Sequence, residues 1–514
     1  MPAIRNRLAR CLAVGLALAA AWPARADPPR PVLSSDDLEL IDSATWGITT
    51  SEAARFVRMG RARWLAAQLH PAPEAGLPAA VQQRIDADPS AGRPLRSLLA
   101  ELEVQARTAS GLTDPEAKTV AQAAYQASLN DVARASMSRT ILRDLYAPAQ
   151  LRERMTWFWF NRFNVHAAKA NLRAMVGDYV DTAIRPHALG RFRDLLGATL
   201  RHPAMMRYLD NAESAAGKVN ENYARGIMEL HTTGVGAGYT QADVEALARI
   251  LTGAGIDTKP DDPKLRPELQ ARLVRDGAFL FNPARHDGGD KVFLGRPVAG
   301  GGFEEIETAL DLLARHPKTA ESVSRATAAY FVGDDPPAPM VSRMAETFGR
   351  RDGDIAAVLE TMFGSPDFAA ARTRHLKDPM TFVLSALRLA YDETPITNTQ
   401  PIQNWLNRLG QGLFNHATPD GYPAGSAAWS GPGQMTARFE VARQIGGGSA
   451  GLFKAAPDAP AGASERPAFP LLQNELYFTV LRSRLAPATR ATLDQAVSPQ
   501  EWNALYLASP DFMR

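Results

Sequence analysis

Apolar residues recur at intervals of three and four along most of the chain, and short polar signals precede many of these runs. Downstream of Thr240 the apolar positions are Val244, Leu247, Ala248 and Leu251. This spacing places them on one face of a helix. A Ser or Thr followed three residues later by an acidic residue can cap the first turn of a helix. This pattern occurs at Thr49, Thr113, Thr240 and Ser498. We therefore predict a mainly α, multi-helix globular protein.

Alternation of the kind that is typical of strands is sparse. The clearest strand signals are two short apolar runs, residues 279–281 (FLF) and 292–294 (VFL), which flank a polar turn at 286–290. Runs of this kind on either side of a Gly- and Asp-rich turn predict a β-hairpin or a short sheet. We expect this small β insertion near residues 279–295, within an otherwise helical chain.

Polar residues are densest between residues 155 and 255, where His, Asn, Glu and Arg alternate with apolar helical turns. The segments include MTWFWFNRFNVH, IRPHALGRFRDLL, LRHPAMMRYLDN and VNENYARGIMELHTTGV. Burying polar groups that have no task costs free energy, so their gathering between helices favours a functional site. The aromatic run at 157–163 is expected to pack in the core, with a stacking platform for a flat ligand as the alternative.

A helix predicted over residues 219–230 separates its polar side chains from its apolar ones. The polar stripe holds Glu221, Asn222, Arg225 and Glu229. Glu221 and Arg225 are four residues apart and can form an ion pair. Two interpretations stay open. One is a solvated face with an ion pair, and the other is a catalytic site in which Glu221 is the acid or base and Arg225 orients it or binds an anionic group.

His187 is the other catalytic candidate, assisting Glu221. It follows Pro186 at an expected helix start, where backbone N–H groups disfavour the protonated imidazole. His202, just before Pro203, is expected to contact the last carbonyls of the preceding helix. The remaining candidates are substrate-binding groups of the same and later motifs: Asn220, Asn222, His166, Asp210, His231 and Trp429.

Patterns typical of metal, nucleotide and serine-hydrolase sites are missing from the sequence. We find no His-Glu-x-x-His motif, no Gly-x-Ser-x-Gly motif, no phosphate-binding glycine loop and no haem motif. Four residues could converge on a metal from different helices: His166, His187, His231 and Asp210. Their spacing neither requires nor excludes this, so metal and cofactor stay unknown from the sequence.

The first 26 residues have the organisation of an export signal. Arg5, Arg7 and Arg10 precede an apolar run over residues 12–21, and the sequence ARA at 24–26 offers a cleavage site. The apolar run is too short to span a bilayer, and no twin arginine is present. We therefore expect Sec-type export to a periplasmic or extracellular location.

Cleavage after residue 26 would change the charge and the cysteine content. It removes four arginines, so 57 basic residues fall to 53 against 55 acidic ones and the net charge becomes −2. It also removes Cys11, the one cysteine, which leaves no disulfide or thiolate site. A charge near zero does not favour nucleic-acid binding. No second long apolar segment follows, so no transmembrane anchor is expected after cleavage.

We expect four segments along the chain. They are a signal peptide at 1–26, a helical domain at 27–453 with the polar site core at 155–255, a loop or linker at 454–468, and a C-terminal helical segment at 469–514 that packs on the main domain. The linker is assigned from its Pro and Ala content, which is typical of loops.

A series of motifs extends over nearly the whole mature chain. They are WFWFNRFNVH, IRPHALGRFRDLL, HPAMMRYLDN, NENYAR, ELHTTGV, GYTQADV, ARILTG, HDGGDKVFLG, ALDLLARHP, FVGDDPP and TPDGYP, with the region of Trp429. Together they resemble a large exported bacterial family of unknown function, domain-of-unknown-function family 1800. The resemblance implies no established activity. Members are often encoded beside a second exported family, numbered 1501 in the same series, which implies a functional partnership.

One position departs from the family pattern. After the Asn-Glu-Asn motif the family usually reads Ala-Arg-Glu, and this chain has Ala224, Arg225 and Gly226. The resemblance therefore implies that a carboxylate normally present is missing here. A site that depended on this carboxylate would be altered or inactive.

Two functions follow from these patterns. In the first, a polar cleft of an exported protein carries out acid–base or hydrolytic chemistry on an envelope or extracellular polymer. In the second, the polar network fixes helix packing, and the protein is a non-catalytic binding or assembly partner of the neighbouring 1501 family. The density of polar residues favours the first function, and glycine at position 226 favours the second.

Overall fold

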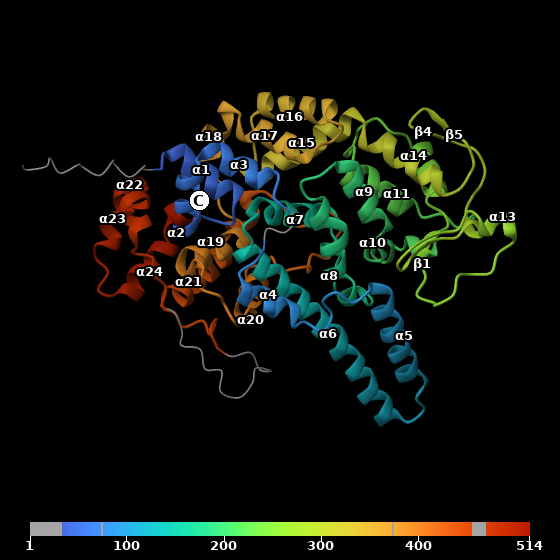
Figure 1. The fold of residues 1–514 in the computed structure, drawn as a ribbon, viewed down its shortest axis with the longest axis horizontal. Coiled ribbons are helices and arrows are strands. Elements are labelled where there is room, and N and C mark those ends of the chain that lie inside the picture. The colour runs from blue at the N-terminus through green and yellow to red at the C-terminus, as the bar shows by residue number, and fades with distance from the viewer. Residues whose placement is uncertain (1–32, 73–75, 373–374, 455–468) are drawn as a thin grey trace, which may run out of the picture. The chain divides into compact units, whose positions relative to one another are not determined.

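Helices form most of the described chain, as the apolar spacing predicts (Figure 1). The computed structural model describes residues 33–72, 76–372, 375–454 and 469–514. The expected signal peptide (1–26) and most of the expected linker (454–468) lie outside these residues. The N-terminal helices are α1 (Ser35–Ala44), α2 (Thr50–Met59), α3 (Arg61–Leu69), α4 (Ala79–Asp86), α5 (Leu95–Gly111), α6 (Pro115–Tyr146) and α7 (Gln150–Arg162).

The region predicted to hold the polar site is made of short helical segments. They are η1 (Leu172–Ala174), α8 (Val176–Asp178), η2 (Tyr179–Ile184), η3 (Arg185–His187), α9 (Phe192–Arg201), α10 (Pro203–Tyr208), η4 (Asn211–Glu213), α11 (Glu221–Gly226), η5 (Ile227–His231) and α12 (Gln241–Ile250). The helix predicted over 219–230 is thus an α-helix from Glu221 that becomes π-helical at Ile227. All four predicted apolar positions of α12 are buried: Val244, Leu247, Ala248 and Leu251.

Small antiparallel sheets occupy the predicted β insertion. The segments are β1 (Ala254–Ile256), α13 (Pro267–Gln270), β2 (Val274–Asp276), β3 (Phe279–Phe281), η6 (Pro283–Arg285), β4 (Lys291–Phe293) and β5 (Arg296–Val298). β3 is the central strand of a three-stranded sheet with β1 and β2, whereas β4 pairs with β5. The two strands predicted from the sequence therefore exist but lie in different sheets. All three residues of β3 are buried. One of its two partners, β1, precedes the predicted insertion at residues 279–295 in the sequence.

The C-terminal half returns to helices. They are α14 (Phe303–Ala314), α15 (Pro317–Val332), α16 (Ala338–Arg350), α17 (Ile355–Phe363), α18 (Pro366–Arg372), α19 (Pro379–Tyr391), α20 (Gln400–Arg408), η7 (Ser426–Trp429), α21 (Pro432–Gly446), η8 (Tyr477–Leu481), α22 (Arg482–Arg484), α23 (Pro487–Leu493), α24 (Pro499–Leu507) and α25 (Pro510–Met513). α24 packs against α21. A Cβ at Gly446 would lie 2.7 Å from the backbone nitrogen of Ala504, so glycine permits this close approach.

Most of the predicted helix caps form. Thr49 and Ser498 accept a hydrogen bond from the backbone of the residue three positions on, and Thr240 and Asp243 form a complete capping box. The cap predicted at Thr113 is wrong, because α6 is capped by Asp114, whose carboxylate accepts from the Ala117 backbone. A carboxylate at this position also favours the positive end of the helix dipole.

The aromatic run of α7 lies in the core. Trp157, Trp159 and Phe160 are buried, and the Trp159 Nε1–H donates to the Ala188 carbonyl oxygen at 2.9 Å. The expectation of core packing is confirmed, and burial leaves these rings no open face on which a ligand could stack. Within the described residues no helix has the length and apolar character needed to cross a membrane.

Candidate functional site

A cleft of about 780 Å³ between helices α9 and α14 is lined mainly by charged side chains. α9 supplies Arg193, Asp194 and Arg201, and α14 supplies Glu307 and Asp311. Further lining residues come from α5, α8, η3, β2 and the ends of nearby helices: Arg96, Asp178, His187, Arg191, His202, Asp276, Arg315 and Asp352. We call this the α9–α14 cleft.

Matched spacing on the two helices explains why opposite charges meet here. Arg193 and Arg201 lie eight residues apart on α9, and Glu307 and Asp311 lie four apart on α14. Residues at these intervals share one face of a helix. Between the arginines, Gly197 leaves room for the Arg193 guanidinium, since a Cβ there would lie 2.9 Å from its Nη1.

Arg193 is held in this cleft by hydrogen bonds to two carboxylates. Its Nη2 donates to Oε2 of Glu307 at 2.6 Å, and its Nε donates to Oδ1 of Asp311 at 2.5 Å. Burial opposes its charge, but these two carboxylates outweigh burial and raise the pKa of Arg193. Arg201 also pairs with Glu307 and lies over the Phe303 ring. This end of the network is therefore preorganised.

The network continues toward solvent. Asp311 also pairs with Nη1 of Arg315 at 3.3 Å, and Arg315 Nε lies 3.0 Å from Oδ1 of Asp352. Asp352 in turn pairs with Arg191 at 3.2 Å. The Arg315 side chain is 60% exposed, against 18% for Arg193. Exposed pairs contribute little to stability, so these outer groups can change partners at low cost.

His202 and Asp178 form a further polar pair of the cleft. The His202 Nδ1 accepts from the Ala204 backbone at 3.1 Å, which leaves Nε2 as the donor to Oδ2 of Asp178 at 2.9 Å. The prediction that His202 contacts the last carbonyls of α9 is wrong, because its side chain caps the start of α10. Pro203 begins that new helix, whose first N–H groups need an acceptor.

His187 lines the same cleft at the end of η3. It is half-buried, and burial lowers its pKa below the usual 6.5, although the nearby Asp194 carboxylate partly opposes this. The imidazole is therefore neutral at pH 7. A neutral imidazole that lines an open cleft can accept a proton, and Asp194 would stabilise the imidazolium that forms.

Glu221 and Arg225 lie on a surface that does not belong to this cleft. They do not pair directly in the structure. The Gln241 side chain bridges them, donating to Oε2 of Glu221 at 2.8 Å and accepting from Nη2 of Arg225 at 2.8 Å. Arg225 also lies 3.7 Å from Glu229. Glu221 is not among the residues that line the cleft with His187, so the structure does not assemble the predicted Glu221–His187 couple.

The two asparagines beside Glu221 have different surroundings. Asn220 caps α11, because its Oδ1 accepts from the Tyr223 backbone at 3.1 Å while its Nδ2 donates to the Leu209 carbonyl at 2.7 Å. Both polar atoms are thus used by the fold. Asn222 is exposed. Neither side chain lines the α9–α14 cleft.

His231 is buried, with 2% of its surface exposed. Its ring lies 4.7 Å from that of Phe163, and its Nε2 has no hydrogen-bond partner among the described residues. Burial, together with the nearby Arg162 charge, lowers the pKa of His231 to about 3. The structure therefore places this residue in the core rather than at a surface that a ligand reaches.

Three further predicted residues lie outside the cleft. Asp210 is exposed and accepts from Lys169 Nζ at 2.8 Å, and His166 lies three residues before this lysine. Trp429 is 4% exposed, and its Nε1–H donates to the Pro423 carbonyl at 3.1 Å. Its indole packs within the TPDGYP region, which gives it a role in holding that loop.

The asparagine-rich end of α7 holds the same loop. Asn161 accepts from the backbone N–H of Tyr422 at 2.7 Å and donates to its carbonyl at 2.8 Å. Asn164 donates to the carbonyls of His416 and Thr418. Gly421 has φ +74°, and a Cβ there would overlap the Asn161 carbonyl. Two of the motifs noted in the sequence therefore meet as a structural unit.

Gly226, which follows the Asn-Glu-Asn motif on α11, offers a test of local structure. Its backbone is helical, with φ −57° and ψ −42°, and an added Cβ would meet only Cδ1 of Leu209 at 3.8 Å. We expect Gly226→Ala to raise the free energy of unfolding by about 0.5–1 kcal/mol, because alanine loses less backbone entropy in a helix. Thermal unfolding would measure this. Gly421→Ala is the matched control and should destabilise, and a loss of stability in both variants would contradict the open space at position 226.

Within the described ranges, no group of three or more His, Cys, Asp or Glu side chains is placed to hold a metal ion. The fold and the site define a mainly helical protein with a charged, ligand-sized cleft. The family described as "Protein of unknown function (DUF1800)" has a model that matches residues 39–514. The chain therefore belongs to this family. No curated protein and no solved structure matches it.

Three of the motifs that carry the family resemblance converge on the α9–α14 cleft. IRPHALGRFRDLL supplies His187 and Arg193, HPAMMRYLDN supplies His202, and ALDLLARHP supplies Asp311 and Arg315. Sequence reasoning found His187 and missed the charged network. The signal that could have found it is the run of opposite charges at intervals of four on two separate helices.

Proposed function

We propose that this is an exported protein that binds a segment of an envelope or extracellular polymer in the α9–α14 cleft and acts on it by acid–base chemistry, with His187 as the base. One observation carries the proposal. A neutral imidazole lines a cleft of about 780 Å³ together with a network of alternating arginines and carboxylates. Export rests on the sequence of residues 1–26.

The network indicates the kind of polymer. Both signs of charge line the cleft, so a ligand that carries carboxylate and amino groups can exchange partners with Arg315 and Asp352 without leaving a charge unpaired. A ligand that carries only negative or only positive charge would pair with one of these two side chains and leave the other unpaired. Arg193 stays fixed by Glu307 and Asp311 and gives the cleft a rigid wall on which a substrate can be positioned.

His187 supplies the chemistry. In its neutral form it accepts the proton of a water molecule or ligand hydroxyl, which makes that oxygen a nucleophile toward a linkage of the polymer. Asp194 stabilises the positive charge on the imidazole until the linkage breaks and the imidazolium returns the proton to the leaving group. The rate should be level near pH 7 and fall only when the pH approaches the pKa of His187, which burial places below 6.5, because a protonated His187 cannot accept a proton.

Soluble peptidoglycan fragments are a suitable first probe, because they carry both carboxylate and amino groups. We expect the mature protein to bind them, His187→Gln to bind within about twofold of wild type but to release product at least tenfold more slowly, and Arg193→Gln to bind at least tenfold more weakly. Arg350→Gln, an exposed arginine of α16 outside the cleft, is the matched control and should behave as wild type.

Dextran sulfate and polylysine serve as ligands of a single charge sign and should bind more weakly than the fragments. Wild-type behaviour of both His187→Gln and Arg193→Gln would show that the cleft is not the site. In that outcome the second interpretation of the sequence, a non-catalytic partner of the 1501 family, becomes the better one. Co-purification of a second exported protein in a one-to-one ratio would support it.

A further inference from the structure

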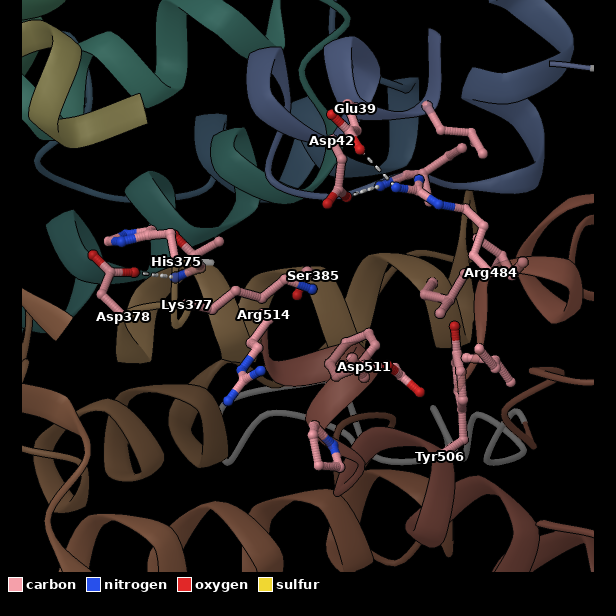
Figure 2. A pocket seen from close by; sticks show the side chains of 18 of the residues that line it. Glu39, Asp42, His375, Lys377, Asp378, Ser385, Arg484, Tyr506, Asp511 and Arg514 are labelled. Atoms are coloured by element: carbon pink, nitrogen blue, oxygen red, sulfur yellow. Dashed lines mark hydrogen bonds and ion pairs between the residues drawn. The ribbon is translucent and has the colours of Figure 1, made fainter. Parts of the chain in front are cut away.

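A second cavity, of about 350 Å³, lies where α1 and α19 meet the C-terminal segment (Figure 2). It shares no lining residue with the α9–α14 cleft. Helix α1 contributes Glu39 and Asp42, and the C-terminal segment contributes Arg484, Asp511 and Arg514. We call it the α1–α19 cavity. The hydrogen-bond donors and acceptors of its charged side chains that the protein leaves unpaired indicate the charge of a ligand that fits it.

The carboxylates on the α1 side already have donors. Oε1 of Glu39 accepts from Nη2 of Arg484 at 2.9 Å, and Oδ1 of Asp42 accepts from the Ile48 backbone at 3.3 Å. Figure 2 shows these two acidic side chains on α1 turned toward Arg484. Their charge is thus engaged within the protein.

The carboxylates on the opposite side are also occupied. Asp378 caps α19 by accepting from the Thr381 backbone at 2.8 Å, and its second oxygen accepts from Gln411 at 3.1 Å. Asp511 accepts from the Ala486 backbone at 2.9 Å. Every carboxylate that lines the cavity therefore has at least one donor from the protein.

One cationic side chain of the cavity, in contrast, has N–H donors without an acceptor in the described part of the chain. Arg514 lines the cavity and has no hydrogen-bond or ion-pair partner among the described residues. Arg154, which also lines the cavity, is held by the protein: it is 5% exposed, and its Nη1 donates to the Thr45 carbonyl at 2.8 Å. The unused hydrogen-bonding capacity of this cavity is thus that of the Arg514 N–H donors.

Apolar groups complete the wall. Leu38, Leu389 and Leu485 line the cavity, as does the Phe512 ring, which carries Lys377 Nζ 4.0 Å from its centroid. A volume of about 350 Å³ falls at the small end of ligand-binding pockets. The cavity therefore suits a small molecule with an anionic head and an apolar body.

We propose that the α1–α19 cavity is a binding site for a small organic anion, a carboxylate or a phosphate monoester. Arg514 holds the anionic head, and the leucine and Phe512 side chains cover the apolar body. The site is separate from the polymer-binding cleft and does not depend on the function proposed for it. An arginine guanidinium offers paired N–H donors that match the oxygens of either head group.

Calorimetric titration of the mature protein tests this with three probes of similar shape: benzoate, phenyl phosphate and the neutral benzyl alcohol. We expect at least one anion to bind in a one-to-one ratio and benzyl alcohol to bind at least tenfold more weakly. The stronger anion identifies the head group. Arg514→Gln should weaken that anion at least tenfold. Arg482→Gln, an exposed arginine nearby that does not line the cavity, should leave it unchanged.

The Arg514→Gln protein should fold normally, because the side chain is exposed and has no partner within the described residues. His187→Gln should keep wild-type anion binding, which separates this site from the α9–α14 cleft. The proposal is overturned if neither anion binds, if benzyl alcohol binds as well as the anions, or if Arg514→Gln keeps wild-type affinity.

Discussion

Replacing Arg185 by methionine will lower the free energy of unfolding by about 3–5 kcal/mol, because it strands a buried carboxylate. The carboxylate belongs to Glu153, whose side chain is 2% exposed. Two nitrogens of Arg185 donate hydrogen bonds to this carboxylate: Nε donates to Oε2 at 2.9 Å, and Nη2 donates to Oε1 at 2.7 Å. Burial opposes the arginine charge, but Glu153 outweighs burial and raises the pKa of Arg185.

A second acid, Asp144, lies beside Glu153. Asp144 lines the same small internal cavity, of about 10 Å³, and its Oδ2 has no partner among the described residues. Burial and the neighbouring Glu153 raise the pKa of Asp144 well above its usual value. Without Arg185, the remaining close cation of Glu153 is Arg152, at 3.4 Å. The Glu153 carboxylate would then lose both of its short hydrogen bonds from Arg185 and keep only this longer contact.

Urea unfolding of Arg185→Met, Glu153→Leu and the double variant measures this coupling. We expect each single variant to lose several kcal/mol and the double variant to lose much less than their sum, because the double variant buries no unpaired charge. Arg134→Met removes an exposed partner of Asp131 and should cost less than about 1 kcal/mol. Additive losses in the double variant would show that Arg185 and Glu153 do not act as a pair.

Helix caps and buried helix faces could be predicted from the sequence, because they depend on residues that are close together along the chain. The Thr240 capping box and the buried face of α12 need only residues within about three turns. The error at Thr113 arose between two adjacent acceptors, where Asp114 beside Pro115 proved the better cap. Errors of one residue are what local patterns allow.

The charged cleft could not be predicted from the sequence, because the residues that form its ion pairs are far apart along the chain. Arg193 reaches residues 114 and 118 positions away, and Arg191 reaches one 161 positions away. Sequence reasoning gave greater weight to the polar stripe around Glu221, which the structure places on a surface bridged by Gln241. A dense polar motif indicates which helices have polar faces, but only the packing shows which of those faces meet.

The stability of the folded protein will fall as the pH is lowered from 6.5 to 5, with a slope from His231 that steepens toward a limit of about 1 kcal/mol per pH unit. The pKa of this buried imidazole is about 3 in the folded state, against 6.5 as the ordinary value. Below pH 6.5 the unfolded chain therefore binds a proton that the folded chain does not. The contribution of neutral His231 is fully present above pH 6.5 and is lost as the pH falls toward 3.

Unfolding free energies measured between pH 7 and 5 give the His231 contribution as the difference between the slopes of wild type and His231→Leu, because the raised pKa of Asp144 adds a slope of opposite sign to both proteins. We expect His231→Leu to remove most of the slope and to be more stable than wild type at pH 5, since leucine suits the contact with Phe163 and leaves no nitrogen unpartnered. His187→Gln, at a half-buried imidazole, should keep most of the slope. A His231→Leu protein that is as acid-sensitive as wild type would show that the folded state accommodates the charged imidazole, with Arg162 or Phe163 moving away from it.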